Sequence, residues 1–204
     1  MPRQLALLVT PLLLAISLQQ FGVAALIQAK AWLAPILVER AWRESLAAGG
    51  QPVKPWPWAD TWPVAQLFVP SLGVSRYILH GDSGHALAFG PGHDEGSAAL
   101  GTDGVAVVGG HRDTHFAFLR ELGQGESIEL QLPDGRREYY QVVETVVVDS
   151  TRGLLPISDQ APQLLLITCY PFTAISEAGS LRYVVRMVPN TDELMTWQRD
   201  RTRA

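Results

Sequence analysis

Short apolar segments separated by glycine-rich turns occupy most of the chain from Ala65 onward, and this pattern constrains the fold more than any other feature. Residues 126–132 and 139–147 alternate between apolar and polar types, which is typical of half-buried strands. Pro133-Asp134-Gly135 between them predicts a hairpin turn. Eight strands are predicted in all, over residues 65–69, 74–79, 85–89, 104–108, 127–132, 138–148, 163–168 and 181–188. With only short helices among them, the fold is predicted to be all-β, a closed or nearly closed barrel.

An uncharged, mostly apolar segment precedes this region. No charged residue lies between Arg3 and Lys30, and residues 5–27 are mostly Leu, Ala, Val and Ile. As a helix, this segment would reach ~35 Å at ~1.5 Å per residue, more than a hydrocarbon core of ~30 Å. We therefore predict a transmembrane signal-anchor helix at residues 1–28. A cleaved signal peptide with its apolar region at residues 5–18 is the alternative, and both would send the remaining chain across a membrane.

Residues 29–63 are predicted to form a helical stalk followed by a Pro/Trp-rich segment. Apolar residues at helical spacing predict a helix over 29–48, and Gly49-Gly50 ends it. Four prolines and three tryptophans within residues 51–63 exclude a helix or a central strand there. We interpret this Pro/Trp-rich segment as an extended linker whose indoles pack on the domain, with a substrate-facing aromatic wall as the alternative. The catalytic barrel is predicted at residues 64–190 and a helical tail at residues 191–204.

The only cysteine of the chain lies where a strand ends. Cys169 follows the apolar run of residues 164–168 and precedes Tyr170-Pro171, where the chain must turn. A thiol in this position can be presented to a substrate as a nucleophile. The alternative is that Cys169 is a small core residue. A net charge of −4 without a basic stripe argues against nucleic-acid binding.

Two further strands offer partners for the thiol. His111 follows the predicted strand that ends at Val108, and Arg182 lies on the last predicted strand. The pKa values of an ordinary thiol and an ordinary imidazole differ by about two units, so moving a proton from the first to the second costs ~3 kcal/mol of free energy. Arg182 would keep its charge, favour the thiolate and donate to a developing oxyanion. Arg186, four residues later on the same strand face, is the competing candidate.

Three more residues are predicted to support the substrate or the oxyanion. The amide of Tyr170 is a candidate oxyanion donor, and His93 is a candidate lining residue. Thr168 points to the face opposite Cys169, so we expect it to orient the site. The i, i+4 spacing of His111 and His115 also occurs in helical metal pairs, but no second cysteine or well-spaced carboxylate accompanies it. We therefore expect neither a metal nor another cofactor.

Taken together, these segments resemble the signature of the sortase family. The matching residues are Gly110-His111-Arg112-Asp113, Leu166-Ile167-Thr168-Cys169 and an arginine thirteen positions after the cysteine, Arg182. Residues 79–96 also resemble the stretch before the sortase histidine. Residues 54–63 resemble the start of the sortase class found in Gram-negative bacteria. The similarity extends from residue 54 to about residue 188.

This resemblance implies an eight-stranded sortase barrel and a cysteine transpeptidase anchored in the inner membrane, with its catalytic domain in the periplasm. Cys169 would attack the Thr–Gly amide of an LPxTG-like sorting signal on a secreted or surface protein. His111 would protonate the departing amine and deprotonate the incoming amine acceptor, while Arg182 would hold the substrate and oxyanion. Two alternatives stay open: a cysteine peptidase that hydrolyses its peptide, and a membrane-tethered binding module without turnover.

Overall fold

The structure is a computed structural model that describes residues 2–152, 162–174 and 179–190. The predicted helical tail at residues 191–204 lies outside these ranges. The chain forms two compact units, residues 1–37 and residues 38–204. Helix α1 (Pro2–Ala47) belongs to both, and it ends at Gly49 and Gly50, whose φ angles are 67° and 94°. These glycines allow the left-handed turn that the predicted stop requires.

Helix α1 includes residues 2–28 of the segment for which a membrane anchor is predicted. Within the part of the chain that the structure describes, no helix combines the length and the apolar character needed to cross a membrane. The side chains of residues 1–12, 26, 27, 29 and 30 lie outside that part.

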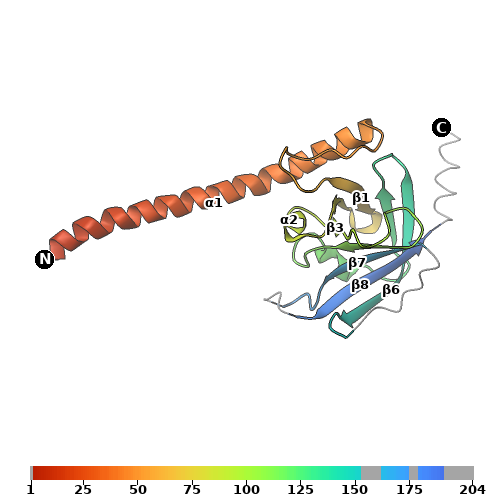
Figure 1. Cartoon of the computed structure of the whole chain (residues 1–204). Helices are drawn as coiled ribbons and strands as arrows, with labels where there is room; N and C mark the ends of the chain where they lie inside the picture. Colours follow the sequence, from red (N-terminus) through yellow and green to blue (C-terminus); the bar gives the residue numbers. More distant parts are fainter. Residues whose placement is uncertain (1, 153–161, 175–178, 191–204) are drawn as a thin grey trace. The chain divides into compact units, whose positions relative to one another are not determined.

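Eight strands close a barrel in the order β1-β2-β3-β4-β7-β8-β6-β5, as the labelled strands in Figure 1 partly show. Pairs β2/β3 and β4/β7 are parallel, and the other pairs are antiparallel. The strands are β1 (Pro63–Val69), β2 (Val74–His80), β3 (Gly92–His93), β4 (Val105–Gly109), β5 (Ser127–Gln131), β6 (Arg137–Asp149), β7 (Gln163–Cys169) and β8 (Leu181–Pro189). The predicted eight-stranded barrel is confirmed.

Alternating burial along the strands fills the inside of the barrel. In β4, Ala106 and Val108 are buried while their neighbours are partly exposed, and β5 shows the same alternation. The inward side chains form one core, which includes Leu67, Ile78, Val108, Leu130, Leu164, Leu166, Val185 and Met187. Because the interior is occupied by these side chains, polar groups of the strands lie on the outside or at the barrel ends.

One predicted strand is wrong. Residues 85–89 do not form a strand, because Ser83 caps the short helix α2 (Gly84–Leu87) by accepting a hydrogen bond from the amide of Ala86 at 3.3 Å. The third strand, β3, comes later and has only two residues. A side chain at Gly92 would overlap the carbonyl oxygen of Gly81, so the pairing of β3 with β2 requires a glycine there.

Two short 3₁₀ helices join the strands, η1 (Pro70–Leu72) and η2 (Ala117–Glu121). For the segment before Gly123, the sequence predicts a short helix that Asp113 or Thr114 would cap. The helix is present, but Phe116 occupies its cap position and no side chain caps it. Phe116 is fully buried in the core, so packing fixes the start of η2.

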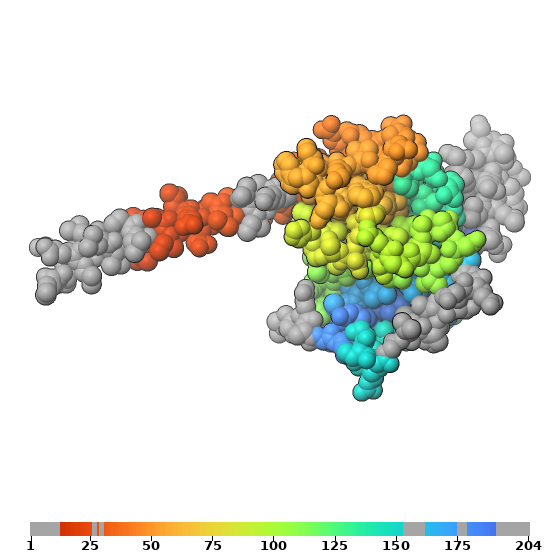
Figure 2. All heavy atoms as spheres, viewed as in Figure 1, coloured from red at the N-terminus to blue at the C-terminus, as the bar shows by residue number. Residues whose placement is uncertain are grey.

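The Pro/Trp-rich segment packs through two of its three indoles. Trp56 meets Phe89 edge to face at 5.0 Å between ring centroids, and Trp62 stacks on His80 at 3.9 Å. Trp58 is 82% exposed. In Figure 2 the orange atoms of this segment lie against the yellow-green atoms that follow β2. These contacts agree with a linker that packs on the domain.

Candidate active site

The pairing of β7 with β8 places Arg182 directly opposite Cys169. Residues opposite one another in an antiparallel pair share a sheet face, with Cβ atoms about 4.5–5.5 Å apart. Arg186 instead lies opposite Leu165, four residues back along β7, and its Nε donates to Glu144 at 2.9 Å. Of the two arginines weighed from the sequence, the register places Arg182 beside the thiol.

The parallel pairing of β4 with β7 places His111 at the same end of the barrel. Gly109 pairs with Ile167, and the amide of Gly110 donates to the carbonyl oxygen of Ile167 at 3.1 Å. Parallel neighbours end on the same side, so the residue after Gly110 lies near the residues after Ile167. His111 and Cys169 are therefore brought together from segments 58 positions apart.

Cys169 belongs to the outer face of the barrel. Leu164, Leu166 and Thr168 alternate with it along β7 and are buried, the two leucines in the core. On β4, Ala106 and Val108 face the core in the same way. The outer face of this strand pair therefore carries apolar residues that lead to the thiol, Val105, Val107, Leu165 and Ile167.

Thr168 connects the two reacting segments. Its side chain is buried, with the residue 2% exposed, and Oγ1 donates to the carbonyl oxygen of Gly110 at 2.7 Å. Thr168 directly precedes Cys169, and Gly110 directly precedes His111. This hydrogen bond joins the residue before the thiol to the residue before the imidazole.

The guanidinium of Arg182 makes backbone contacts at the start of β8. Its Nη1 donates to the carbonyl oxygens of Gly179 at 2.7 Å and Leu181 at 2.9 Å. Both acceptors lie within three residues before Arg182 in the chain. These bonds orient a permanent positive charge on the strand opposite the thiol.

The amide of Tyr170 has a partner that the sequence did not indicate. It donates to the carbonyl oxygen of Leu181 at 3.1 Å, which extends the β7–β8 ladder by one residue beyond Cys169. The amide therefore has to leave this bond before it can donate to an oxyanion. The ring of Tyr170 packs instead with Phe172 and Tyr183.

The imidazole of His93 contacts the segment that precedes β4. His93 pairs with Val108, and the chain then follows β4 back toward its first residue, where the Ala98 amide donates to the carbonyl oxygen of Val105 at 2.9 Å. His93 Nε2 lies 2.9 Å from the carbonyl oxygen of Ala98. The side chain thus contacts the segment before β4 and lines a cavity of about 560 Å³.

The segment after His111 carries charges whose environments alter their ionisation. A hydrogen bond from Arg112 lowers the pKa of the exposed Asp113 carboxyl, against a smaller opposing effect of desolvation. Burial lowers the pKa of His115, and the charges of Arg76 and His111 lower it further. The neutral form of His115 is therefore favoured. Among the described residues, no three His, Cys, Asp or Glu side chains are grouped as metal ligands.

Comparison with known proteins decides the family. A family model described as "Sortase domain" matches residues 67–190, which is more than half of the chain. The chain belongs to the sortase family. This assignment supports a cysteine-type enzyme, because sortases are cysteine transpeptidases.

Individual sortases match over part of their length. Sortase D of Bacillus subtilis (strain 168) is 32% identical over 120 residues, covering 58% of this chain and 60% of the relative. The crystal structure of sortase C-1 from Actinomyces oris has a TM-score of 0.52 at 28% identity, covering 63% of this chain and 72% of that one. Sortase A from Corynebacterium diphtheriae has a TM-score of 0.56 at 23% identity, covering 86% and 95%, and supports the fold alone. These relatives give no support to the narrower assignment to the Gram-negative class.

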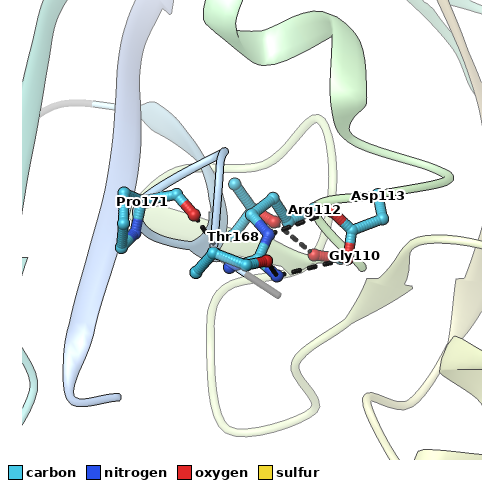
Figure 3. A network of polar contacts seen from close by, with 6 residues as sticks. Gly110, Arg112, Asp113, Thr168 and Pro171 are labelled. Carbon is cyan, nitrogen blue, oxygen red and sulfur yellow. Dashed lines mark hydrogen bonds and ion pairs between the residues drawn. The ribbon is translucent and has the colours of Figure 1, made fainter. Parts of the chain in front are cut away.

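One buried residue of this sortase was given no role from the sequence. Arg112 is 5% exposed, and its guanidinium donates to the carbonyl oxygens of Pro171 and Ala174 at 2.8 and 2.9 Å. Figure 3 shows it between the two reacting segments. Its position next to His111 was visible in the sequence, but its burial depends on the turn after Cys169, which sequence patterns do not place.

Glycine at position 110 is required by packing. A Cβ there would lie 2.7 Å from Cδ2 of Phe116, whereas a Cβ at the neighbouring Gly109 would meet nothing within 4 Å. Neither glycine has a positive φ angle. The two positions therefore differ in the space available and not in backbone strain.

Gly110→Ala is expected to destabilise the barrel, because the buried ring of Phe116 must shift or the segment before His111 must move. Overpacking of this kind costs about 1–3 kcal/mol, so the melting temperature should fall by several degrees in a thermal unfolding scan. Gly109→Ala is the matched control and should unfold close to the wild type. Equal melting temperatures for the two variants would contradict the close contact with Phe116.

Proposed function

We propose that this protein is a membrane-anchored sortase-type transpeptidase that cleaves an LPxTG-like sorting signal and transfers it to an amine. The observation that carries the proposal is the cross-strand pairing of Cys169 with Arg182 beside the end of the strand that leads to His111. A nucleophile, a proton carrier and a permanent cation at one barrel end are the groups that acyl transfer through a thioester needs.

In the first half-reaction, the Cys169 thiolate attacks the carbonyl carbon of the scissile Thr–Gly amide. The carbonyl π electrons move to oxygen, and the guanidinium of Arg182 stabilises the resulting oxyanion. Protonated His111 gives its proton to the amide nitrogen as the carbon–nitrogen bond breaks. The products are a thioester on Cys169 and a free amine.

In the second half-reaction, neutral His111 accepts a proton from the incoming amine as that amine attacks the thioester carbon. The carbon–sulfur bond then breaks and the Cys169 thiolate departs. A new amide is formed, and His111 and Cys169 return to their starting protonation states. Water in place of the amine would turn the same sequence into hydrolysis, which is the alternative peptidase function.

The outer face of β4 and β7 supports an apolar, extended substrate. Val105, Val107 and Ile167 lie on that face and are partly exposed, and the strands lead directly to Cys169. The apolar Leu-Pro portion of an LPxTG-like signal would bind along these side chains, with its threonine carbonyl at the sulfur. Charged side chains are absent from the outward positions of β4, which agrees with an apolar ligand.

We further propose that α1 anchors the protein in the inner membrane, with the barrel in the periplasm. Leu13, Leu14, Leu18 and Phe21 are exposed on this helix, and no charge lies between Arg3 and Lys30. Burying such side chains in lipid is favourable. The Gram-negative setting is a prediction from the Pro/Trp-rich segment.

Cys169→Ala should form no adduct with a sorting-signal peptide, because the carbonyl carbon then has no nucleophile. Mass spectrometry of the wild-type protein incubated with LPxTG-type peptides should show the mass of the acyl portion on Cys169. Full cleavage by Cys169→Ala would remove the thiol from the mechanism.

Adding an amine to the wild-type reaction separates the remaining functions. A ligated product identifies the transpeptidase, and hydrolysed peptide alone identifies the peptidase. A protein that binds the peptide without any adduct is the non-catalytic binding module.

Arg182→Ala should lower kcat by about 10²–10³, because one preorganised oxyanion donor is removed. Arg182→Lys should restore only part of the rate, since a single ammonium replaces the planar guanidinium. Arg186→Ala is the matched control on the same strand, and it should retain wild-type kcat because its exposed ion pair with Glu144 is worth ~0–1 kcal/mol. A larger loss in Arg186→Ala would contradict the β7–β8 register.

Deleting residues 1–28 should release the protein from membranes, because the apolar segment proposed as the anchor is removed. Fractionation of cells that express the full chain or the deletion variant is the measurement. The full chain should stay in the membrane pellet after carbonate washing, and the deletion variant should appear in the soluble fraction. A full chain that is washed off would contradict the anchor.

A further inference from the structure

His111 and Cys169 are each flanked by residues that hydrogen-bond to one another. On the preceding side, Thr168 Oγ1 donates to the carbonyl oxygen of Gly110 at 2.7 Å. On the following side, Arg112 Nη1 donates to the carbonyl oxygen of Pro171 at 2.8 Å. Figure 3 shows both connections side by side. The two reacting residues are thus enclosed between two cross-links from segment to segment.

Of the two residues that make these cross-links, Thr168 and Arg112, Arg112 is the more unusual. Its side chain is only 4% exposed, whereas its carboxylate partner, Asp113, is 61% exposed. Nε and Nη2 of Arg112 donate to that carboxylate at 3.0 and 3.2 Å, and Nη2 also donates to the carbonyl oxygen of Ala174 at 2.9 Å. A buried cation is costly unless its donors are satisfied, so this arrangement needs a reason beyond filling space.

The carbonyl partners of Arg112 define the turn after Cys169. Pro171 and Ala174 are themselves joined, because the Ala174 amide donates to the carbonyl oxygen of Pro171 at 3.2 Å. The guanidinium therefore holds both ends of one turn. The backbone of Arg112 directly follows His111. The carbonyl oxygen of His111 accepts a hydrogen bond from the Phe116 amide at 3.0 Å, which fixes this segment. Both segments are anchored, and Arg112 connects them.

We propose that Arg112 is a positioning residue for acyl transfer. Its guanidinium fixes the turn after Cys169 relative to the segment that carries His111, and so sets the separation of the sulfur and the imidazole. This inference rests on the proposed function, because it assigns Arg112 a part in the same reaction. Arg112 acts through the placement of His111 and Cys169, whereas Arg182 acts on the substrate.

The geometry also explains why lysine is a poor substitute. The two carbonyl oxygens are reached by two different nitrogens of one planar guanidinium, Nη1 and Nη2. An ammonium group has its donors on a single nitrogen, at the end of a flexible stem. Lysine would keep the charge and lose the two-pronged geometry, so Arg112→Lys separates the effect of position from that of charge.

The first measurement needs no substrate. The rate of Cys169 alkylation by iodoacetamide is measured across pH for the full chain, for His111→Gln and for Arg112→Gln. We expect His111→Gln to change the wild-type profile, because the imidazole and the thiol interact, and Arg112→Gln to resemble His111→Gln. Arg112→Lys should give an intermediate profile, and it carries the test if Arg112→Gln does not fold.

The second measurement uses an LPxTG-type peptide with an amine acceptor. Arg112→Gln should lower kcat by about ten- to hundredfold, the loss typical of misplaced reacting groups, while KM stays within about threefold. Arg120→Gln is the matched control, since Arg120 is an exposed arginine nearby on η2. Asp113→Asn should lower kcat less than Arg112→Gln does, because the hydrogen bonds from Arg112 to the carbonyl oxygens of Pro171 and Ala174 remain.

The proposal is overturned by three results. The first is a wild-type alkylation profile in Arg112→Gln, or a profile that does not depend on His111 at all. The second is an unchanged kcat in a folded Arg112→Gln variant, with only the melting temperature lowered. The third is an Asp113→Asn variant as impaired as Arg112→Gln, which would assign the effect to the ion pair. Failure of the wild-type chain to act on any peptide would instead refute the proposed function, and the alkylation result would stand independently.

Discussion

The parallel pairing of β4 with β7 is the constraint on which the rest of the site depends. It is one of only two parallel pairs among the strands that the structure describes; β7 ends at Cys169, and β4 ends two residues before His111. Antiparallel pairing would have sent His111 and Cys169 to opposite ends of the barrel. Because the pairing is parallel, two hydrogen bonds suffice to join them: the Gly110 amide donates to the carbonyl oxygen of Ile167, and Thr168 Oγ1 donates to the carbonyl oxygen of Gly110.

The closed core then decides on which side of the sheet chemistry takes place. Leu164 and Leu166 of β7 fill the interior together with Val185 and Met187 of β8. Strand alternation consequently sends Cys169 and Arg182 to the other face. A thiol facing inward would be closed off by apolar side chains, whereas an outward thiol at a strand end can meet a peptide. The packing of the barrel and the accessibility of the nucleophile thus follow from one alternation.

Much of this arrangement is encoded in local patterns. Seven of the eight predicted strands match observed strands, because apolar or alternating segments of five or more residues bounded by turn residues are a strong signal. The exception, residues 85–89, is a short, mostly apolar segment between two glycines, but Ser83 supplies a helix cap there and the true β3 has only two residues. A two-residue strand has no periodicity to detect. It exists because Gly92 can approach the backbone of Gly81.

The details of the site that could not be predicted from the sequence all depend on contacts between distant segments. The amide of Tyr170 is taken by Leu181 because the β7–β8 ladder continues beyond Cys169. Arg112 is buried because the turn at Pro171 and Ala174 passes over it. The choice between Arg182 and Arg186 rested on register, since both lie on the same face of β8. The periodicity of a sequence predicts which face of a strand a side chain lies on. Which residues it contacts depends on the register of the strands and on the turns between them.

The cavity near His93 shows why shape alone does not locate the chemistry in this fold. Its charged lining groups are largely satisfied by one another: His80 Nε2 lies 2.9 Å from a Glu95 carboxylate oxygen, and Arg136 Nε donates to Asp134 at 2.7 Å. Trp62 stacks on His80 as well.

The hollow is lined by His93 and by residues that precede β4, whereas the thiol is on the last residue of β7. An extended peptide does not need an enclosed cavity, because it can lie along the outer face of two strands. The reactive end of this barrel is therefore the end where the strands bring thiol, imidazole and guanidinium together, although a cavity exists elsewhere.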